Sequence, residues 1–508
     1  MSLQLAHIQN GSAMDIADMP RDDFGWLRGM ILEKVAGGSH LAALFPFRHD
    51  KDTLLAAVLT ATDQPGMWLG LAEIGDSFPS LTPECPQAHL FEREIAETWN
   101  IAPRGHPWLK PVRFPQPSGE ARNKHLPESF GGGRGPSVMD FFQVEGEEVH
   151  EVAVGPVHAG VIEPGHFRFQ CHGEEVMHLE ISLGYQHRGI EKALEGGPGP
   201  RTRHLLETAA GDTTCGHALA YAMNIESLAD LAVSAEADRV RGIGLELERI
   251  ANHVGDLGAL SGDVGFLPTA SYCGRLRGDI LNLTALICGN RFGRGLIVPG
   301  GVGHGIDPAM SALAAERLGA AMRDIRGAVA LMFKSPSVLA RFEGTGVVDR
   351  GTAIDLGLVG PAARASGLEV DVRCFHPHGP YRDTEVPLQL RMHGDVMDRA
   401  SQRREEVDTS ARLIEGWLGQ ACAAKPADAY ARRQLRPDAF AVSLTEGWRG
   451  QVCHAAVTDS RGAFSAYKVV DASFHNWTGL AMALRNQQIS DFPLCNKSFN
   501  LSYCGYDL

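Results

Sequence analysis

Apolar residues recur at helical spacing over several long stretches of the chain. The clearest stretch covers residues 239–260, and the apolar positions there are Val240, Ile243, Leu247, Ile250, Val254 and Leu257. Residues three and four apart lie on one face of a helix, so this pattern predicts a helix with a buried stripe. Similar patterns predict helices over residues 24–35, 91–99, 279–288, 310–332 and 395–418.

Shorter apolar runs indicate strands. One uncharged run covers residues 54–60, and further runs cover 151–154, 167–169 and 176–181. Gly173 and Glu174 stand between the last two runs, where a hairpin would turn. The first 115 residues or so therefore mix helix and strand, whereas the middle of the chain is rich in helices.

A break in composition separates these two parts. The segment after Phe114 reads PQPSGEARNKHLPESFGGGRGPSV, which is rich in Gly, Pro, Ser and charge and has no hydrophobic period. Such a composition is typical of a flexible linker. We therefore expect an α/β domain at 1–114, a linker at 115–137 and a larger domain at 138–508. The expected fold class is α+β, with a central helical bundle and peripheral β elements in the larger domain.

Composition and charge exclude several functions. The chain has 508 residues, is 44% hydrophobic and carries a net charge of −14, which argues against nucleic acid as the main partner. No run of apolar residues is long enough to span a bilayer, and the N-terminus lacks the pattern of a secretory signal. Ten cysteines are scattered without a CxxC pair, so free thiols are expected and a disulfide framework is not.

A polar stripe accompanies the apolar stripe of residues 239–260. Glu246, Arg249, His253 and Asp256 also recur at spacings of three and four, so they can form ion pairs along the helix. A solvated face would be the ordinary interpretation. Glycines on the same helix weaken it because they allow other backbone to approach closely: Gly242, Gly244, Gly255 and Gly258.

Several motifs follow one another in order along the chain. Those of the larger part are GPVHAGVIEPGHFRF (155–169), LGYQHRGIEKALE (183–195), GHALAYAMNIE (216–226), ELERIANHVGDLG (246–258), GLVGPAARASG (357–367), HGDVMDRASQRREE (393–406) and DFPLCNKSFNLSYCGYDL (491–508). Through these motifs, residues 150–508 resemble the large subunit of membrane-bound [NiFe] hydrogenases and its relative, the quinone-chamber subunit of respiratory complex I. In the first part, FEREIAETWNIAPRGHPWLKP (91–111) resembles the small α/β subunit of complex I.

The chain departs from this family at the metal site. Active [NiFe] hydrogenases hold the metals with four thiolates from two CxxC motifs, and soft thiolates suit nickel and iron. The resemblance places these positions at Ala210, Thr213, Ser502 and Gly505, none of which offers a thiolate. We therefore expect no Ni–Fe centre and no other metal in this chain. Cys215 and Cys504 lie nearby at the wrong spacing, and we interpret them as small buried hydrophobes, with a redox-active pair as the alternative.

The quinone chamber of complex I is also incomplete. His158 matches the histidine of the GPxH motif, but the loop continues as AGVIEPG without a second histidine. Gly211 stands where the relatives have a tyrosine that approaches the quinone head group. A buried quinone carbonyl needs hydrogen-bond donors, so the missing donors weaken this interpretation without excluding a quinone.

The resemblance also indicates candidate residues. Glu163 stands where hydrogenases carry a glutamate that passes protons, and we expect Glu163 and His217 to be proton-relay candidates. A turn glutamate and a core histidine are the structural alternatives. His187 and Arg188 are expected near the interface with an iron–sulfur partner, where Glu191 can pair with either of them. Further candidates for buried charged networks are Arg364, Asp398 and Arg399.

Together these features imply a subunit of a membrane-associated, energy-converting oxidoreductase complex. The chain would bind no cofactor itself and would contact an iron–sulfur subunit that holds a [4Fe–4S] cluster, and membrane ion-translocating subunits would complete the hetero-oligomer. It would lie at the cytoplasmic, inner face of the cell membrane, and its own active site is expected to be degenerate. One alternative is a site for a quinone or another acceptor in the vacated cavity. The other is a non-catalytic scaffold between the cluster subunit and the membrane arm.

Overall fold

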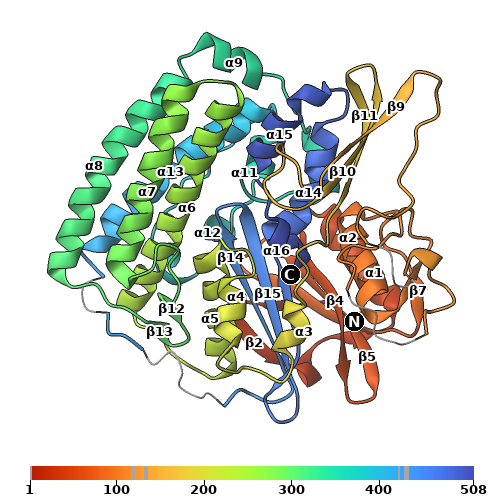
Figure 1. Ribbon diagram of the computed structural model, residues 1–508. Helices are drawn as coiled ribbons and strands as arrows, with labels where there is room; N and C mark the ends of the chain where they lie inside the picture. The colour runs from red at the N-terminus through yellow and green to blue at the C-terminus, as the bar shows by residue number, and fades with distance from the viewer. Residues whose placement is uncertain (1–2, 116–120, 131–134, 422–423, 428–433) are drawn as a thin grey trace.

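The computed structural model describes residues 3–115, 121–130, 135–421, 424–427 and 434–508 (Figure 1). The chain combines a bundle of long helices with several antiparallel sheets, so the expected mixture of helix and strand is confirmed. Among the described residues, no helix is both long enough and apolar enough to cross a membrane.

Four long helices pack against one another on one side of the molecule, at the left in Figure 1. α6 is the central one because it contacts the other three. Aspartate or serine caps the first turn of three of them, since Ser234, Asp307 and Asp395 each accept a hydrogen bond from a backbone N–H two or three residues into the helix. The bundle comprises α6 (Ala235–Asp263), α7 (Leu267–Cys288), α8 (Pro308–Met332) and α13 (Val396–Leu418).

The helix predictions are confirmed in position, with one helix longer than expected. α7 begins at Leu267 and not at Asp279, because its first half, LPTASYCGRLRG, mixes polar and small residues that hide the apolar period. Backbone approaches only one of the four glycines of α6 for which it was expected: a Cβ at Gly258 would lie 3.6 Å from the Ala270 carbonyl oxygen, whereas side chains approach the other three. A Cβ at Gly242 would meet Pro380 and Trp417, and one at Gly244 would meet Leu296 at 2.6 Å.

A four-stranded sheet lies beside the bundle, and it was not predicted. Its order is β16 (Phe464–Val470), β15 (Gly450–Thr458), β14 (Ala439–Gly447) and β2 (Ser12–Asp15). All nine residues of β14 and all nine of β15 are buried, because α5 (Thr214–Leu228) covers one face and other elements cover the second. The expectation of only peripheral β elements is therefore wrong: a sheet buried on both faces has no alternating pattern to reveal it.

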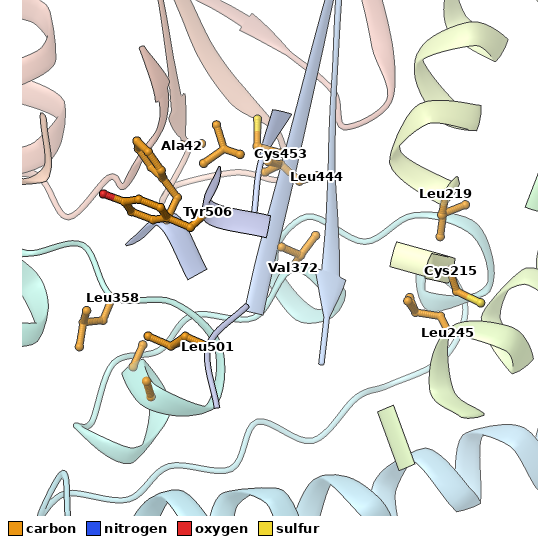
Figure 2. Close-up of a cluster of buried hydrophobic side chains, with 14 of the residues drawn as sticks. Ala42, Cys215, Leu219, Leu245, Leu358, Val372, Leu444, Cys453, Leu501 and Tyr506 are labelled. Carbon is orange, nitrogen blue, oxygen red and sulfur yellow. The ribbon is translucent and has the colours of Figure 1, made fainter. Parts of the chain in front are cut away.

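The N-terminal part forms a second sheet, which continues the same core. Strand β4 contacts β15 and β16, and Figure 2 shows Ala42 of β4 in one apolar cluster with Leu219, Leu444 and Cys453. Helices α1 (Phe24–Ala36) and α2 (His89–Trp99) pack against this sheet. Its strands are β1 (Ala6–Ile8), β6 (Met67–Glu73), β5 (Asp52–Thr60), β4 (Leu41–His49) and β3 (Arg21–Asp22).

The proposed division into domains remains a prediction. Part of the linker, residues 116–120 and 131–134, lies outside the described residues, and Leu126 within the described part packs on Ala96 and Ala102. Strand β2 of the first part pairs with β14 of the second, so the two parts share a sheet.

A three-stranded sheet forms the upper right of Figure 1, and the predicted hairpin joins two of its strands. Its strands are β9 (Val149–Val154), β10 (His166–His172) and β11 (Glu175–Ser182), and Gly173 at the turn has a φ of +59°. The remaining paired strands are β7 (Ser77–Pro79) with β8 (Ala102–Arg104), and β12 (Ile297–Val298) with β13 (Gly301–Val302). The remaining short helices are α3 (Ile190–Leu194), α4 (Thr202–Glu207), α9 (Pro336–Phe342), α10 (Arg350–Asp355), α11 (Gly360–Ala365), α12 (Val372–Phe375), α14 (Ala472–Ala483), α15 (Phe492–Phe499), α16 (Tyr503–Asp507), η1 (Ile16–Asp18), η2 (Pro86–Ala88), η3 (Glu128–Phe130), η4 (Gly379–Arg382) and η5 (Ile489–Asp491).

Candidate functional site

The two segments that would carry the metal ligands are buried and have local structural roles. Ala210 and Thr213 close a turn before α5, where the Thr213 N–H donates to the Ala210 carbonyl at 2.8 Å. Ser502 caps α16, because its hydroxyl accepts a hydrogen bond from the Gly505 N–H at 2.9 Å. The same hydroxyl oxygen lies 3.4 Å from the Cys504 Sγ.

An arginine joins these two segments. Arg449 follows β14 and donates two hydrogen bonds to the Asp212 carboxylate, from Nη1 at 2.5 Å and from Nη2 at 2.8 Å. Its Nε donates to the carbonyl of Asn500, two residues before Ser502. Burial opposes the charge of Arg449, but the Asp212 carboxylate outweighs burial and raises the pKa of the guanidinium. Arg449 thus holds the segment around Asp212 close to the segment around Ser502.

A second carboxylate occupies the same place. Asp471, which precedes α14, is 1% exposed and accepts a hydrogen bond from His217 Nε2 at 3.0 Å. A Cβ at Gly505 would lie 2.9 Å from the Asp471 Cγ, so this glycine leaves room for the carboxylate. Burial alone would raise the pKa of Asp471, but the His217 hydrogen bond and the charge of Arg449 lower it to about 2.

The side chains of Ala210, Thr213, Ser502 and Gly505 provide no thiolate, so they do not fit a Ni–Fe centre. The Arg449–Asp212 ion pair joins the two segments, and Asp471 lies against Gly505. Within the described ranges, no group of three or more His, Cys, Asp or Glu side chains could hold a metal ion.

The two nearby cysteines behave differently from each other. Cys215 is 1% exposed, and burial together with the Glu248 carboxylate raises the pKa of its thiol well above the ordinary value. This agrees with a small buried hydrophobe. Cys504 is only half-buried, so that interpretation is wrong for it. Both are free thiols.

A narrow cavity lies next to the Asp212 segment. Its volume is about 10 Å³, room for about one water molecule, and its lining includes Cys215, Glu248 and Arg291. Burial raises the pKa of Glu248 to about 8, although the N–H groups of Cys215 and Gly216 at the start of α5 donate to it. A quinone ring cannot enter a space of this size. A larger cavity of about 590 Å³ lies elsewhere, between α5, α6 and η4.

The proton-relay candidate Glu163 lies on the loop between β9 and β10. It is half-buried, and its carboxylate accepts a hydrogen bond from Gln186 Nε2 at 2.6 Å. The Gln186 N–H in turn donates to Asp507, a fully buried carboxylate whose pKa burial raises to about 6. On the same loop His158 is exposed, and its ring accepts a hydrogen bond from the Gly160 N–H.

The predicted interface residues His187 and Arg188 bind backbone carbonyls of the C-terminal segment and of the turn before α5. His187 Nδ1 lies 2.8 Å from the Asp507 carbonyl, and Arg188 donates to the carbonyls of Thr208 and Ala209. The expected pairing of Glu191 with His187 or Arg188 is wrong. Glu191 forms its ion pairs with Lys468 at 3.1 Å and Arg113 at 3.5 Å, because α3 begins only at Ile190 and packs on β16.

The polar stripe of α6 is buried and not solvated. Glu246, Arg249 and His253 are all 0% exposed. Arg249 Nε donates to Glu246 at 3.1 Å, and His253 Nε2 lies 2.8 Å from a Glu406 oxygen. Asp256 at the end of the stripe accepts from Arg403 at 2.8 Å. The helical spacing in the sequence predicted this stripe, but it did not indicate the residues of other segments that pair with it.

Arg364 lies in the same buried network. The other two candidates, Arg399 and Asp398, lie outside it. Arg364 donates to Glu446 at 2.8 Å and to Glu406 at 2.6 Å. Arg399 donates to backbone carbonyls and to Ser498, and burial lowers its pKa to about 10. Asp398 accepts from the His393 N–H. The sequence reasoning missed network members on distant segments: Asp371, Arg373, Tyr381, Glu406, Ser410 and Glu446.

This network holds more acid than base. Four carboxyl groups, those of Glu246, Asp371, Glu406 and Glu446, face three guanidinium groups, those of Arg249, Arg364 and Arg373. Burial and the neighbouring Asp371 raise the pKa of Glu446, so it is the member best suited to hold a proton.

The fold and the site define a class: a large α+β subunit, built on a helical bundle, with buried charges around two apposed segments. The profile of the family described as "Respiratory-chain NADH dehydrogenase, 49 Kd subunit" matches residues 263–438. An NADH-quinone oxidoreductase subunit of Deinococcus radiodurans is 30% identical over 275 residues, which cover 53% of this chain and 68% of that protein. The chain therefore belongs to the family of this 49-kDa subunit.

Two further comparisons extend the likeness beyond the matched region. Formate hydrogenlyase subunit 5 of Escherichia coli (strain K12) is 27% identical over 448 residues, which cover 84% of this chain and 76% of that protein. A chain of the membrane-bound sulfane sulfur reductase, an archaeal respiratory membrane complex, has the same fold with a TM-score of 0.63 at 21% identity. The comparison covers 71% of this chain and 99% of that one. The relatives are thus subunits of complex-I-like and hydrogenase complexes.

Proposed function

We propose that this chain is the coupling subunit of a membrane-associated, energy-converting oxidoreductase complex and that it holds no Ni–Fe centre of its own. Electron transfer in a partner iron–sulfur subunit would change the protonation of the buried site, and membrane subunits would translocate protons or other ions in response. The observation that carries this proposal is the Arg449–Asp212 ion pair between the two segments that correspond to metal-binding segments in hydrogenases.

The partners follow from the names of the relatives and from the surface near the site. We propose a hetero-oligomer with an iron–sulfur subunit that holds a [4Fe–4S] cluster and with membrane ion-translocating subunits, at the inner face of the cell membrane. The loop between β9 and β10 exposes Val157 at 89% and Ile162 at 46%, beside Glu163. Exposed apolar side chains next to a half-buried carboxylate suit a surface that a partner covers.

The buried charges supply the chemistry that coupling needs. Arg449 fixes a positive charge between the segments, and this charge acts on the carboxyl groups of Asp212 and Asp471. An electron arriving nearby would favour proton uptake by carboxyl groups whose pKa burial has raised, such as Glu248, Glu446 and Asp507. Gln186 donates one hydrogen bond to Asp507 and another to Glu163, so it holds these two carboxyl groups on one path between the buried site and the exposed loop.

The first experiment asks whether the complex exists. The tagged full-length chain is purified from its native membranes, and its reduced form is examined by electron paramagnetic resonance. The proposal expects an attached iron–sulfur chain with the spectrum of a reduced [4Fe–4S] cluster, together with membrane chains. Recovery of the chain alone, without iron or membrane subunits, would contradict it.

The second experiment separates coupling from scaffolding. In the purified complex, Glu163→Gln removes the half-buried carboxyl group, and Glu174→Gln is the matched control at the exposed hairpin turn. Coupling predicts that the midpoint potential of the partner cluster loses part of its pH dependence in Glu163→Gln only, while assembly stays intact. An unchanged pH dependence in both variants favours the scaffold.

A further inference from the structure

Four buried side chains form an unbroken line of hydrogen bonds beside the Arg449–Asp212 pair. The hydroxyl of Tyr467 on β16 lies 2.9 Å from Nδ1 of His454 on β15. Nε2 of His454 lies 2.9 Å from Nδ1 of His217 on α5. Nε2 of His217 lies 3.0 Å from the Asp471 carboxylate, and none of the four residues is more than 3% exposed.

We propose that these four residues, Tyr467, His454, His217 and Asp471, are a proton relay between the buried sheet and the place where hydrogenases hold their metals. This inference rests on the proposed function, because it names the route by which protons reach that place. It assigns His217 a partner on each side and adds three residues that the sequence had not indicated.

The geometry gives the neutral relay a single direction. The Asp471 carboxylate only accepts, so His217 carries its proton on Nε2 and its Nδ1 must accept. His454 therefore donates from Nε2, and its own Nδ1 accepts from the Tyr467 hydroxyl. Every donor then points toward Asp471, and each ring nitrogen has a partner.

One proton can cross the relay with all atoms balanced. A proton that arrives at the Tyr467 oxygen releases the original hydroxyl proton to His454 Nδ1, and His454 passes its Nε2 proton to His217 Nδ1. His217 is then a cation beside the Asp471 carboxylate, and it donates its Nε2 proton to that carboxylate. Asp471 finally releases the proton toward the Asp212 carboxylate beside Arg449, since the guanidinium itself cannot accept it, and both rings are left in the opposite tautomer.

The groups around the relay favour this use. Burial and the neighbouring His217 hold the pKa of His454 well below its ordinary value, so His454 stays neutral and exchanges tautomers. The His217 hydrogen bond and the guanidinium of Arg449 keep Asp471 ionised, so it is an acceptor at rest and gives up a proton quickly after it has received one. The other titratable or polar groups that face the relay are Tyr221, Asn224, Cys453 and His475.

Nitrogen NMR of the full-length chain labelled with ¹⁵N-histidine tests the relay directly, because it reports which ring nitrogen carries a proton. Across the pH range in which the protein stays folded, we expect the proton of His454 to move between Nε2 and Nδ1. A His454 tautomer that is constant throughout this range would overturn the relay, since a purely structural hydrogen bond does not switch.

The variant Tyr467→Phe tests the route in the assembled complex. It removes one hydroxyl and should slow proton uptake on reduction of the partner cluster by about tenfold or more. Tyr221→Phe is the matched control, a buried tyrosine of α5 in the same apolar cluster, and its uptake rate should equal that of the native protein. Equal rates in both variants would overturn the relay. Failure of the complex to assemble would instead contradict the proposed function, and the NMR test on the chain alone would still stand.

Discussion

Removing the Arg449 guanidinium should destabilise the protein strongly. Arg449 is 6% exposed and binds both oxygens of Asp212, a carboxylate whose side chain is 34% exposed. Loss of one partner from a buried ion pair costs about 3–5 kcal/mol, because the other charge stays behind unpaired. Water can reach part of Asp212, so Arg449→Met should cost about 3 kcal/mol, near the low end of that range.

A double-mutant cycle measures this interaction separately from the packing of the side chain. Urea unfolding followed by tryptophan fluorescence gives the free energy of unfolding for Arg449→Met, Asp212→Asn and the double variant. The cost of the double variant should fall short of the sum of the single costs by about 1–2 kcal/mol. Arg461→Met is the control, because Arg461 is 84% exposed and its loss should cost less than about 0.5 kcal/mol. A coupling energy near zero would refute the view that this pair joins the two segments.

Three further predictions concern stability. Arg364→Met should cost about 3–5 kcal/mol, since two buried glutamates lose their partner; calorimetry checks this, and a cost below about 1 kcal/mol would contradict it. Gly505→Ala should cost about 1–3 kcal/mol in urea unfolding, because its Cβ would lie 2.9 Å from Asp471; an unchanged midpoint would contradict that contact. Burial lowers the pKa of His40 and of His376 from 6.5 to about 4. Between pH 6.5 and pH 4, therefore, these two histidines bind protons in the unfolded chain but not in the folded protein. The free energy of unfolding should therefore decrease as the pH drops from 6.5 to 4, by up to about 3 kcal/mol per histidine. Urea midpoints that do not change with pH would contradict this.

The sequence predicted the elements that have one polar and one apolar face. The helices of the bundle and the hairpin at Gly173 were found because their patterns are periodic or are interrupted by a turn residue. Strands β14 and β15 were missed because they are buried on both faces, so no alternation marks them. Burial on both faces is decided by the packing of distant segments, which the local pattern does not contain.

The site was predictable only where one element carries its own signal. The stripe of Glu246, Arg249 and His253 shows its helical spacing in the sequence, and His217 lies in a recognisable motif. Asp471 and His454 have no such signal. They become part of the site because α14 and β15 bring them to α5, and contacts over more than 200 residues cannot be derived from spacing.

Nickel content tests the central claim most directly, namely that this subunit works without a Ni–Fe centre. The measurement is the molar ratio of nickel to chain in the complex purified from native membranes, by inductively coupled plasma mass spectrometry. The account predicts a ratio near zero in a complex that still shows a reducible iron–sulfur cluster. One nickel per chain would contradict it, because Ala210, Thr213, Ser502 and Gly505 provide no thiolate for that metal.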